Sequence, residues 1–523
     1  MRLLLKFVYP LLLLCACGTG YFGRCTAQPL ADVRLTDSQE FTVGAAYLYE
    51  GTTTVNDTIF HLMRGAPSST LLRPEYMIVR HHEVSDEVAQ RRVDLAPKDL
   101  RGYVRSKPHM LAGKLYVFSE ARNNKAKRWD QYYRAYDPVT LKPSTALKRL
   151  SQVPYKIGSN HHVRIATGSD RQHLVRIRVF NPKSGEAPTI HYQLFGAGMT
   201  PVVDTVLTCP EQYANGAYPE NLYVDDQLNA HLMLRANLVK TKEWKKSPRQ
   251  RSVLTISKEG AKTQTVAYDF GNDQGDERIS VYKPGQNLLY LATATTGGRD
   301  DRVAVGYKLK VLNLSDGTTV RDDVISFSDR AANGSAARGR GDRATFEYLR
   351  VTDLLVDSLG YAYIMGHQQR YPEFPEEYPG VPEENTIKNI VIAQVGPSGE
   401  TQYVRTLAYG STIKGQLPFR YRPYTPMAID GHLYVLLVDR KATVDEFDEI
   451  KPATAFSEWV YRVVHVDGNG EPRDILLDAP ADRKSSFGAP VLTNATHRTF
   501  TARFTSYRNN QESVFKRFTL TRE

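Results

Sequence analysis

The feature that constrains this chain most is a unit of strand, tight turn and strand that recurs along almost its whole length. Three copies in which the second strand opens with a tyrosine are Gly113-Lys114-Leu115-Tyr116, Gly360-Tyr361-Ala362-Tyr363 and Gly431-His432-Leu433-Tyr434, and Asn287-Leu288-Leu289-Tyr290 is a looser copy. Equivalent turns fall at Thr54, Gly113, Asp170, Gln227, Gly285, Gly360, Gly431 and Thr496. These turns are 57 to 59 residues apart over the first five positions and 65 to 75 residues apart over the others. Such spacing is typical of stacked copies of one supersecondary unit and not of two unrelated domains.

Each unit divides into four strands, with short turns between the first and second strands and between the third and fourth. In the sixth unit the predicted strands are Tyr348–Val356, Tyr361–His367, Asn389–Val395 and Thr401–Tyr409. In the seventh they are Pro426–Ile429, His432–Val438, Val460–Val466 and Pro472–Leu477. The residues between them are rich in Gly, Asp, Asn and Pro, which favour tight reversals of the chain. The sequence therefore predicts an all-β fold with one four-stranded sheet in each unit.

Four-stranded sheets repeated seven or eight times resemble the blades of a β-propeller. The resemblance covers nearly all of the chain after its first thirty residues, and it is a resemblance of architecture. The chain lacks the recurrent Trp-Asp dipeptides of WD40 blades and the Ser-x-Asp-x-Gly box of sialidases, and its three tryptophans are too few for quinoprotein docking motifs. The resemblance thus implies a fold and no particular family.

The two ends of the chain suggest how many blades there are. After the seventh unit, only three strands remain, Ala489–Leu492, Thr499–Tyr507 and Ser513–Leu520. The missing outer strand is expected from Ala31–Leu35, which would pair with Ser513–Leu520 and remove an exposed sheet edge. We therefore expect a single domain over residues 31–523 with eight blades. Seven blades is the alternative, and a pair of β-sandwiches is less favoured.

The N-terminus is typical of an export signal. Arg2 and Lys6 precede an apolar run from Phe7 to Ala16, which is too short to span a bilayer and fits a secretory signal peptide. Leu14-Cys15-Ala16-Cys17 resembles the bacterial lipobox, in which Cys17 becomes the lipidated first residue. The alternative is a leader of residues 1–27 cleaved after Cys25-Thr26-Ala27, although Arg24 is unusual at such a site. We expect an exported protein of the bacterial cell envelope, lipid-anchored to the outer membrane or periplasmic.

Cysteine and charge exclude several classes of protein. Cys209 is the one cysteine beyond residue 27, so we expect no disulfide framework and no zinc site built from four thiolates. The formal net charge is +11, and removal of the three basic residues of the leader leaves +8. Basic residues occur along the whole chain without a recognised nucleic-acid module, so no nucleic-acid partner is expected. No motif indicates a cofactor or a metal.

Long loops are expected on one face of the disc. Connections between first and second strands and between third and fourth strands are short. The long connections fall between second and third strands or between units, at Asn237–Gln250, His367–Lys388, Asp439–Glu458 and Asp329–Ala344. These two classes of connection emerge on the same face of a propeller, and long loops on a rigid scaffold commonly carry function. The candidate partner-binding residues in these loops are Trp244, Tyr371, Phe374, Tyr378 and Phe447.

The mouth of the central channel is a second candidate site. First strands line a propeller's channel, so residues near their starts surround its opening. Those candidates are His162, Glu220, Arg278, Arg350, Arg422 and Tyr424. Arginine matches carboxylate in fork geometry, so the group could hold an anionic or sugar-like ligand. Structural salt bridges between neighbouring blades are the alternative explanation.

The sequence leaves the biochemical function open. No nucleophile elbow, metalloprotease helix or phosphate-binding loop occurs. The leading hypothesis is a binding or scaffold module, not an enzyme, with a protein or glycan partner in the envelope. One alternative is a glycan lyase or hydrolase that uses His162, Glu220 and Tyr424, and another is a subunit of a larger envelope assembly. Apolar runs after the leader are short, so we expect membrane attachment through a lipid anchor alone.

Overall fold

The computed structural model describes most of the chain between Val33 and Arg522. Outside the description lie residues 1–32, 45–46, 66–75, 84, 86, 98–99, 101, 105–106, 155–160, 182–186, 215, 237–249, 271–273, 297–302, 328–345, 371–383, 415–423, 441–458, 481–484, 488–491, 495–497, 507–511 and 523.

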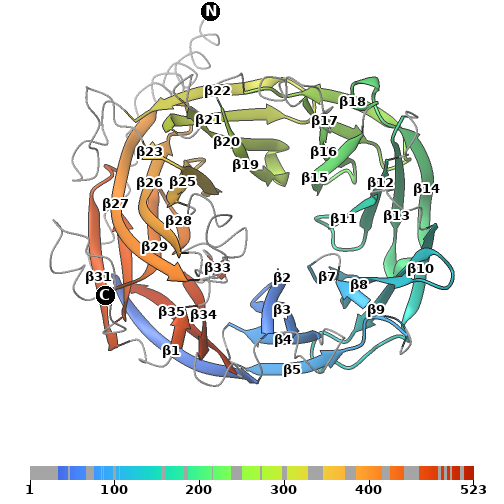
Figure 1. The fold of residues 1–523 in the computed structure, drawn as a ribbon, viewed down its shortest axis with the longest axis horizontal. Helices are drawn as coiled ribbons and strands as arrows, with labels where there is room; N and C mark the ends of the chain where they lie inside the picture. Colours follow the sequence, from blue (N-terminus) through green and yellow to red (C-terminus); the bar gives the residue numbers. More distant parts are fainter. Residues whose placement is uncertain are drawn as a thin grey trace, which may run out of the picture.

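The described residues form eight antiparallel sheets, arranged as blades around a central axis (Figure 1). In each blade the first strand lies nearest the axis and the fourth strand lies at the rim. The chain is therefore an all-β propeller, as the repeat predicted, with eight blades and not the alternative seven. Among the described residues, no helix is long and apolar enough to cross a membrane.

Each blade consists of strands that follow one another from the axis to the rim. Blade 1 comprises β2 (Tyr47–Val55), β3 (Thr58–Gly65), β4 (Tyr76–His82) and β5 (Val88–Val93). Blade 2 comprises β6 (Gly102–Val104) with β7 (His109–Leu111), β8 (Lys114–Asn123), β9 (Arg128–Tyr136) and β10 (Lys148–Pro154), and blade 3 comprises β11 (His161–Thr167), β12 (Leu174–Phe180), β13 (Thr189–Phe195) and β14 (Pro201–Thr208). Blade 4 comprises β15 (Ala217–Val224), β16 (Ala230–Ala236), β17 (Arg251–Ile256) and β18 (Lys262–Ala267). Blade 5 comprises β19 (Gln274–Lys283), β20 (Leu288–Thr296), β21 (Val303–Asn313) and β22 (Thr319–Ser326), with β23 (Phe346–Glu347) paired to β21. Blade 6 comprises β24 (Leu349–Val356), β25 (Ala362–Arg370), β26 (Glu384–Val395) and β27 (Thr401–Lys414), and blade 7 comprises β28 (Tyr424–Ile429), β29 (His432–Arg440), β30 (Trp459–Val466) and β31 (Pro472–Pro480). Blade 8 comprises β32 (Ser485–Phe487) with β33 (Leu492–Asn494), β34 (Thr499–Ser506), β35 (Glu512–Arg522) and β1 (Val33–Gly44).

The repeat in the sequence corresponds to the blades. The eight turns that define it fall at or beside the connection between the first and second strands of the eight blades. The strands predicted in the sixth and seventh units overlap β24–β27 and β28–β31. Strands β25 and β26 are longer than predicted, because Gln368 pairs with Lys388 and Arg370 pairs with Thr386. The loop predicted at His367–Lys388 was therefore too long.

The last blade contains strands from both ends of the described chain. Strand β1 pairs antiparallel with β35, and Leu35 lies opposite Leu520. The paired strand continues to Gly44, well beyond the segment Ala31–Leu35 in which an outer strand was expected. Blade 8 also contacts blade 1, where the Glu83 carboxylate accepts a 2.7 Å hydrogen bond from the Thr499 hydroxyl. The sheet and this contact together close the ring.

Burial falls from the middle of each blade toward its rim. Strand β17 is buried throughout, whereas rim strands β14 and β18 alternate between partly buried and exposed residues. Middle strands are covered on both faces by the neighbouring blades, which is why they are nearly continuous apolar runs. Each apolar cluster of described residues draws on two consecutive blades, as Val175 with Leu232 and Tyr307 with Val391 illustrate. The hydrophobic core therefore lies between blades, and each blade is stabilised by its neighbours.

Turns between third and fourth strands also contact the preceding blade. Gly470, in the turn before β31, has a φ of +83°, and a Cβ added there would lie 2.5 Å from Cγ of Tyr403 in blade 6. The carbonyl oxygen of Gly470 accepts a 2.7 Å hydrogen bond from the Arg405 guanidinium, which also pairs with Glu471 at 2.7 Å. A side chain is excluded at Gly470 because the turn approaches blade 6 so closely.

Candidate functional site

The two faces of the propeller differ in the strand connections that they carry. The short connections between first and second strands and between third and fourth strands lie on one face, which we call the short-loop face. The connections between second and third strands and between blades lie on the other, the long-loop face. Most described residues predicted as channel-mouth candidates lie on first strands near the long-loop face, and a cavity lies on the short-loop face.

Tyr218 of β15 is the centre of a cationic cluster near the long-loop face. The Arg235 guanidinium carbon lies 4.9 Å from the centroid of the Tyr218 ring, and that of Arg164 lies 5.8 Å from it. His162 of β11 meets the same ring edge-on, with centroids 4.4 Å apart. These contacts hold the first strands of blades 3 and 4 together through cation–π and aromatic interactions.

Glu220 is held within blade 4. Its two carboxylate oxygens each accept a hydrogen bond from Arg251 Nε at 3.3 Å, and Oε1 lies 3.7 Å from Arg235 Nε. The Tyr268 hydroxyl donates to Oε2 at 3.4 Å. Burial first, and then the negative charge of Glu220, raises the pKa of Tyr268 well above its ordinary value. Glu220 therefore pairs mainly with cations of its own sheet, and not across blades as the salt-bridge alternative supposed.

The other channel-mouth candidates are dispersed among three further blades. Arg278 of blade 5 lies over Phe270 at 5.2 Å, and Arg350 of blade 6 donates to the Gln369 amide oxygen at 2.9 Å. Tyr424 of blade 7 is completely buried. Its hydroxyl shares a hydrogen bond with the Thr352 hydroxyl, and its ring meets His367 edge-on at 6.0 Å. Arg422 lies outside the described residues.

The loop candidates Trp244, Tyr371, Phe374, Tyr378 and Phe447 also lie outside the described residues, as does Cys17. These loops connect the second and third strands of blades 4, 6 and 7, which are β16 and β17, β25 and β26, and β29 and β30. In the part of the chain that the structure describes, no group of three or more His, Cys, Asp or Glu side chains could hold a metal ion.

The cavity lies between blades 4 and 5 on the short-loop face and has a volume of about 660 Å³. Its walls are the first turns of the two blades together with residues at the start and end of their outer hairpins. They consist of polar side chains with three less polar residues at one side: Asp225, Asp226, Gln227, Asn229, His231, Thr255, Thr263, Gln264, Pro284, Gly285, Gln286, Asn287, Leu314, Ser315 and Asp316. This wall contains no lysine and no arginine.

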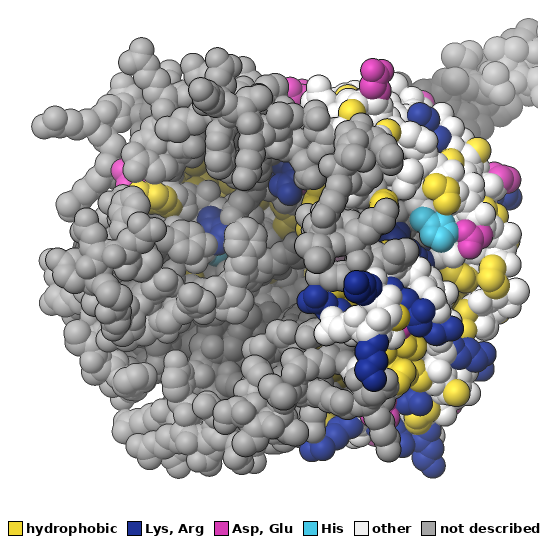
Figure 2. Space-filling model, turned by 45° about the vertical axis from the view of Figure 1, so that its right-hand side comes forward, with side chains coloured by type: hydrophobic (Ala, Val, Ile, Leu, Met, Phe, Trp, Pro, Cys, Tyr) yellow, Lys and Arg dark blue, Asp and Glu magenta, His cyan; other side chains and the backbone are white. Residues whose placement is uncertain are grey.

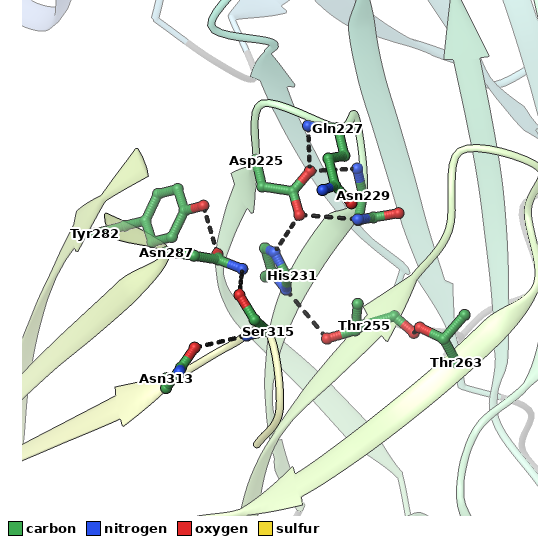
Figure 3. A network of polar contacts seen from close by, with 10 residues as sticks. All are labelled: Asp225, Gln227, Asn229, His231, Thr255, Thr263, Tyr282, Asn287, Asn313 and Ser315. Atoms are coloured by element: carbon green, nitrogen blue, oxygen red, sulfur yellow. Dashed lines mark hydrogen bonds and ion pairs between the residues drawn. The ribbon is translucent and has the colours of Figure 1, made fainter. Parts of the chain in front are cut away.

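Asp225 shapes the blade 4 side of the cavity. Its Oδ1 accepts backbone hydrogen bonds from Gln227 at 2.9 Å and Asn229 at 2.7 Å, and its Oδ2 accepts one from the Asn229 amide at 2.9 Å (Figure 3). Burial alone would raise the pKa of Asp225, but the hydrogen bonds from His231 and Asn229 outweigh it and hold the pKa below its usual range. An aspartate that binds its own backbone two residues on is a typical turn former. The turn is thereby fixed around an ionised carboxylate.

His231 connects this turn to the adjacent strand. Its Nε2 lies 3.3 Å from Asp225 Oδ2, and its Nδ1 lies 3.1 Å from the Thr255 hydroxyl (Figure 3). The His231 ring lies 5.9 Å from that of Tyr282 in blade 5. The floor of the cavity is therefore a buried polar chain with an aromatic contact to the next blade.

Asn287 shapes the blade 5 side. It accepts a 2.8 Å hydrogen bond from the Tyr282 hydroxyl and donates one to Ser315 at 2.7 Å (Figure 3). Burial, followed by the charges of Asp225 and Asp226, raises the pKa of Tyr282. Both turns are thus fixed by internal hydrogen bonds. Gln227 and Gln286, one in each turn, are exposed at the rim of the cavity.

The repeat marks the turns at Gln227 and Gly285 as copies of one unit, but it does not reveal this cavity. Asp225 and His231 flank the predicted turn at Gln227, but the sequence analysis did not single them out. The juxtaposition of Asn287 and Ser315 with that hairpin depends on how blades 4 and 5 stack, which the repeat alone does not specify.

Comparison with known proteins finds no family and only distant structural similarity. No protein-family model and no curated protein sequence match the chain. Among solved structures, the WD40 domain of SCAP from fission yeast has a TM-score of 0.40 at 7% identity and covers 94% of this chain and 98% of its own. The β-propeller domain of the trilobed protease from Pyrococcus furiosus has a TM-score of 0.37 at 10% identity and covers 83% and 96%. The order of the strands in the eight sheets identifies the chain as a β-propeller, and no specific family is found.

Proposed function

We propose that the protein is a non-enzymatic binding module of the cell envelope that holds a neutral glycan in the cavity between blades 4 and 5. The observation that carries the proposal is the cavity wall, which offers amides, hydroxyls and carboxylates without a lysine or arginine. Sugar hydroxyls both donate and accept hydrogen bonds, so they can use carboxylate acceptors and both ends of side-chain amides. Asp225, Asp226 and Asp316 would repel an anionic ligand.

The positions of the candidate catalytic residues favour binding over catalysis. A lyase or hydrolase at the channel mouth would require His162, Glu220 and Tyr424 to act on one substrate. Their strands β11, β15 and β28 belong to blades 3, 4 and 7, and β11 and β28 lie on opposite sides of the ring (Figure 1). Tyr424 is completely buried, and Glu220 is neutralised by arginines. A general acid or base must lie within hydrogen-bond reach of the reacting atoms.

The glycan proposal is tested by titrating the purified protein with neutral oligosaccharides in a calorimeter. Gln227→Ala and Gln286→Ala remove exposed amides from the cavity rim, and each should raise Kd about three- to tenfold, since a hydrogen bond contributes about 0.5–1.5 kcal/mol. Gln172→Ala is the matched control, because Gln172 lies in the corresponding turn of blade 3 and does not line the cavity. Its backbone N–H donates to Asp170 Oδ1 as the backbone N–H of Gln227 donates to Asp225 Oδ1. Unchanged affinity in both cavity variants, or an equal effect of the control, would contradict the proposal.

Export and lipid attachment at Cys17 are part of the proposal. They are supported by the short apolar run and by Leu14-Cys15-Ala16-Cys17 in the sequence. Cys17→Ser should release the protein from the membrane fraction, as fractionation and mass measurement of the mature N-terminus would show. A wild-type chain that begins at Gln28 and is soluble would refute the anchor. The long-loop aromatic residues remain predicted contacts for a second, protein or glycan, partner.

A further inference from the structure

Blade 2 carries an excess of positive charge. Residues 107–150, which make up most of blade 2, contain ten Lys and Arg against three Asp and Glu. Residues 424–480 of blade 7 contain five against eleven. The basic residues are therefore not evenly distributed around the ring, although their scatter along the sequence suggested that they were.

Exposed positive side chains of blade 2 lie at both faces and on the rim strand between them, and we call this arrangement the band. Lys and Arg side chains gather in the lower part of the described surface in Figure 2, on the side of the ring where blade 2 lies in Figure 1. Besides Lys107 and Lys114, six Lys and Arg side chains of this group are exposed, and we call these six the blade 2 cations: Arg122, Lys125, Lys127, Lys142, Lys148 and Arg149. The first three lie at the β8–β9 hairpin on the long-loop face, the last two lie on rim strand β10, and Lys142 lies in the connection on the short-loop face.

Blade 2 has three acidic residues, of which Asp137 accepts hydrogen bonds from the backbone N–H groups of Val139 and Thr140 in its own turn, at 3.0 and 2.6 Å. Glu120 and Asp130 are each 1% exposed and lie inside the blade. Asp130 pairs at 2.8 Å with Arg128, and Arg128 is not one of the blade 2 cations. Within the described part of the chain, no ion pair engages Lys125, Lys127, Lys148 or Arg149. These four side chains thus keep their charge available to a partner.

The backbone that carries these cations is fixed. The β8–β9 turn is closed by a 3.0 Å hydrogen bond from the Ala126 N–H to Asn123 Oδ1, and the Asn123 amide donates to Asp130 at 3.2 Å. Strand β10 pairs with β9, where Arg149 lies opposite Tyr132. The charges are therefore carried on a rigid sheet, and less conformational entropy is lost on binding than for charges on a loose tail.

We propose that the rim of blade 2 binds an acidic polysaccharide, separately from the neutral glycan of the cavity between blades 4 and 5. Strand β9 has nine residues, so the band extends roughly 30 Å from one face to the other at about 3.4 Å per residue. A linear polyanion can follow this convex rim and reach both ends of the band, whereas a planar bilayer would contact few of the cations at once. The described aromatic residues of blade 2 are buried or partly buried, which disfavours the base stacking used to bind single-stranded nucleic acid.

The test uses the whole protein with alginate as the polyanion and dextran as the neutral control polymer. The protein should bind alginate at low ionic strength and not dextran, and affinity should fall steeply with salt. Lys125→Gln/Lys127→Gln and Lys148→Gln/Arg149→Gln should each weaken alginate binding by about tenfold or more and reduce its salt dependence. The matched control is Lys258→Gln/Lys262→Gln, which removes two exposed cations from blade 4 and should leave alginate binding nearly unchanged.

Three results would overturn the proposal. The first is no binding to alginate at low salt, and the second is equal weakening by the blade 4 control. The third is stronger binding to phosphatidylglycerol vesicles or to single-stranded DNA than to alginate. Neutral oligosaccharide binding is measured separately with the cavity variants, so failure of one proposal is distinguishable from failure of the other.

Discussion

The Oδ2 oxygen of Asp357 accepts a 2.8 Å hydrogen bond from the backbone N–H of Gly431, across the boundary between blades 6 and 7. The Oδ1 oxygen accepts two more from the backbone N–H groups of Leu359 and Tyr361, at 3.0 and 2.9 Å. One carboxylate thus closes the first turn of its own blade and holds the first turn of the next. Lys283 of blade 5 donates to the Asp357 carbonyl oxygen at 3.2 Å, so this turn is joined to both of its neighbours.

Asp357→Ala should lower the free energy of unfolding by about 2–3 kcal/mol, because hydrogen bonds to charged groups contribute about 1.5–3 kcal/mol and a buried donor is left unsatisfied. Chemical denaturation measures this change through the midpoint of the transition. Asp316→Ala is the control, since Asp316 accepts hydrogen bonds only from residues of its own exposed turn, Thr318 and Asn313. Equal losses of unfolding free energy in the two variants would show that the hydrogen bond between blades 6 and 7 adds nothing to stability.

Gly470→Ala should be more destabilising than Gly113→Ala. Both glycines have positive φ angles, of +83° and +72°, so both substitutions cost backbone strain of about 1 kcal/mol. The Cβ at position 470 would also overlap the buried Tyr403 ring, whereas nothing lies within 4 Å of a Cβ at position 113. The additional overpacking should cost about 1–3 kcal/mol in equilibrium unfolding. Equal stability of the two variants would contradict the close approach of blades 6 and 7.

Lowering the pH below about 6.5 should destabilise the protein through buried histidines. Burial first, and then the charge of Lys107, lowers the pKa of His109 from 6.5 to about 3. The native state therefore binds fewer protons than the unfolded state, so stability is retained above pH 6.5 and is lost as the pH falls from 6.5 toward 3. At pH 5 the loss from a group with this shift is roughly 2 kcal/mol.

His109→Gln should reduce the difference in unfolding free energy between pH 7 and pH 5 by roughly this amount. Denaturation of wild type and variant at both pH values measures that difference. Gln172→Ala, which removes an exposed side chain that does not titrate, is the control and should leave this difference unchanged. The prediction fails if His109→Gln retains the full pH dependence of the wild type.

The features that the sequence predicted well are those with a local cause. The first turns of blades 2, 6 and 7 could be found because Gly113, Gly360 and Gly431 each supply turn chemistry three residues before a tyrosine. Strand ends were less predictable, since the end of β25 depends on pairing with β26 and not on its own composition. Tyr424 was placed at the channel mouth from its position at the start of a strand, but packing against His367 and Thr352 buries it. The cavity between blades 4 and 5 depends on the stacking of two blades, which strand periodicity does not describe.

Glu220 provides a test that separates a structural role from a catalytic one. Glu220→Ala should lower the free energy of unfolding by about 2 kcal/mol, because Arg251, with a side chain 2% exposed, would lose its counterion. The value is below that for a fully buried pair because the Glu220 side chain is 22% exposed. The double variant Glu220→Ala/Arg251→Met should recover part of the loss, since it removes the unpaired buried charge, and a double-mutant cycle measures the coupling. An unchanged stability of Glu220→Ala, together with a glycan-cleaving activity that Glu220→Gln abolishes, would replace the binding module with the enzyme.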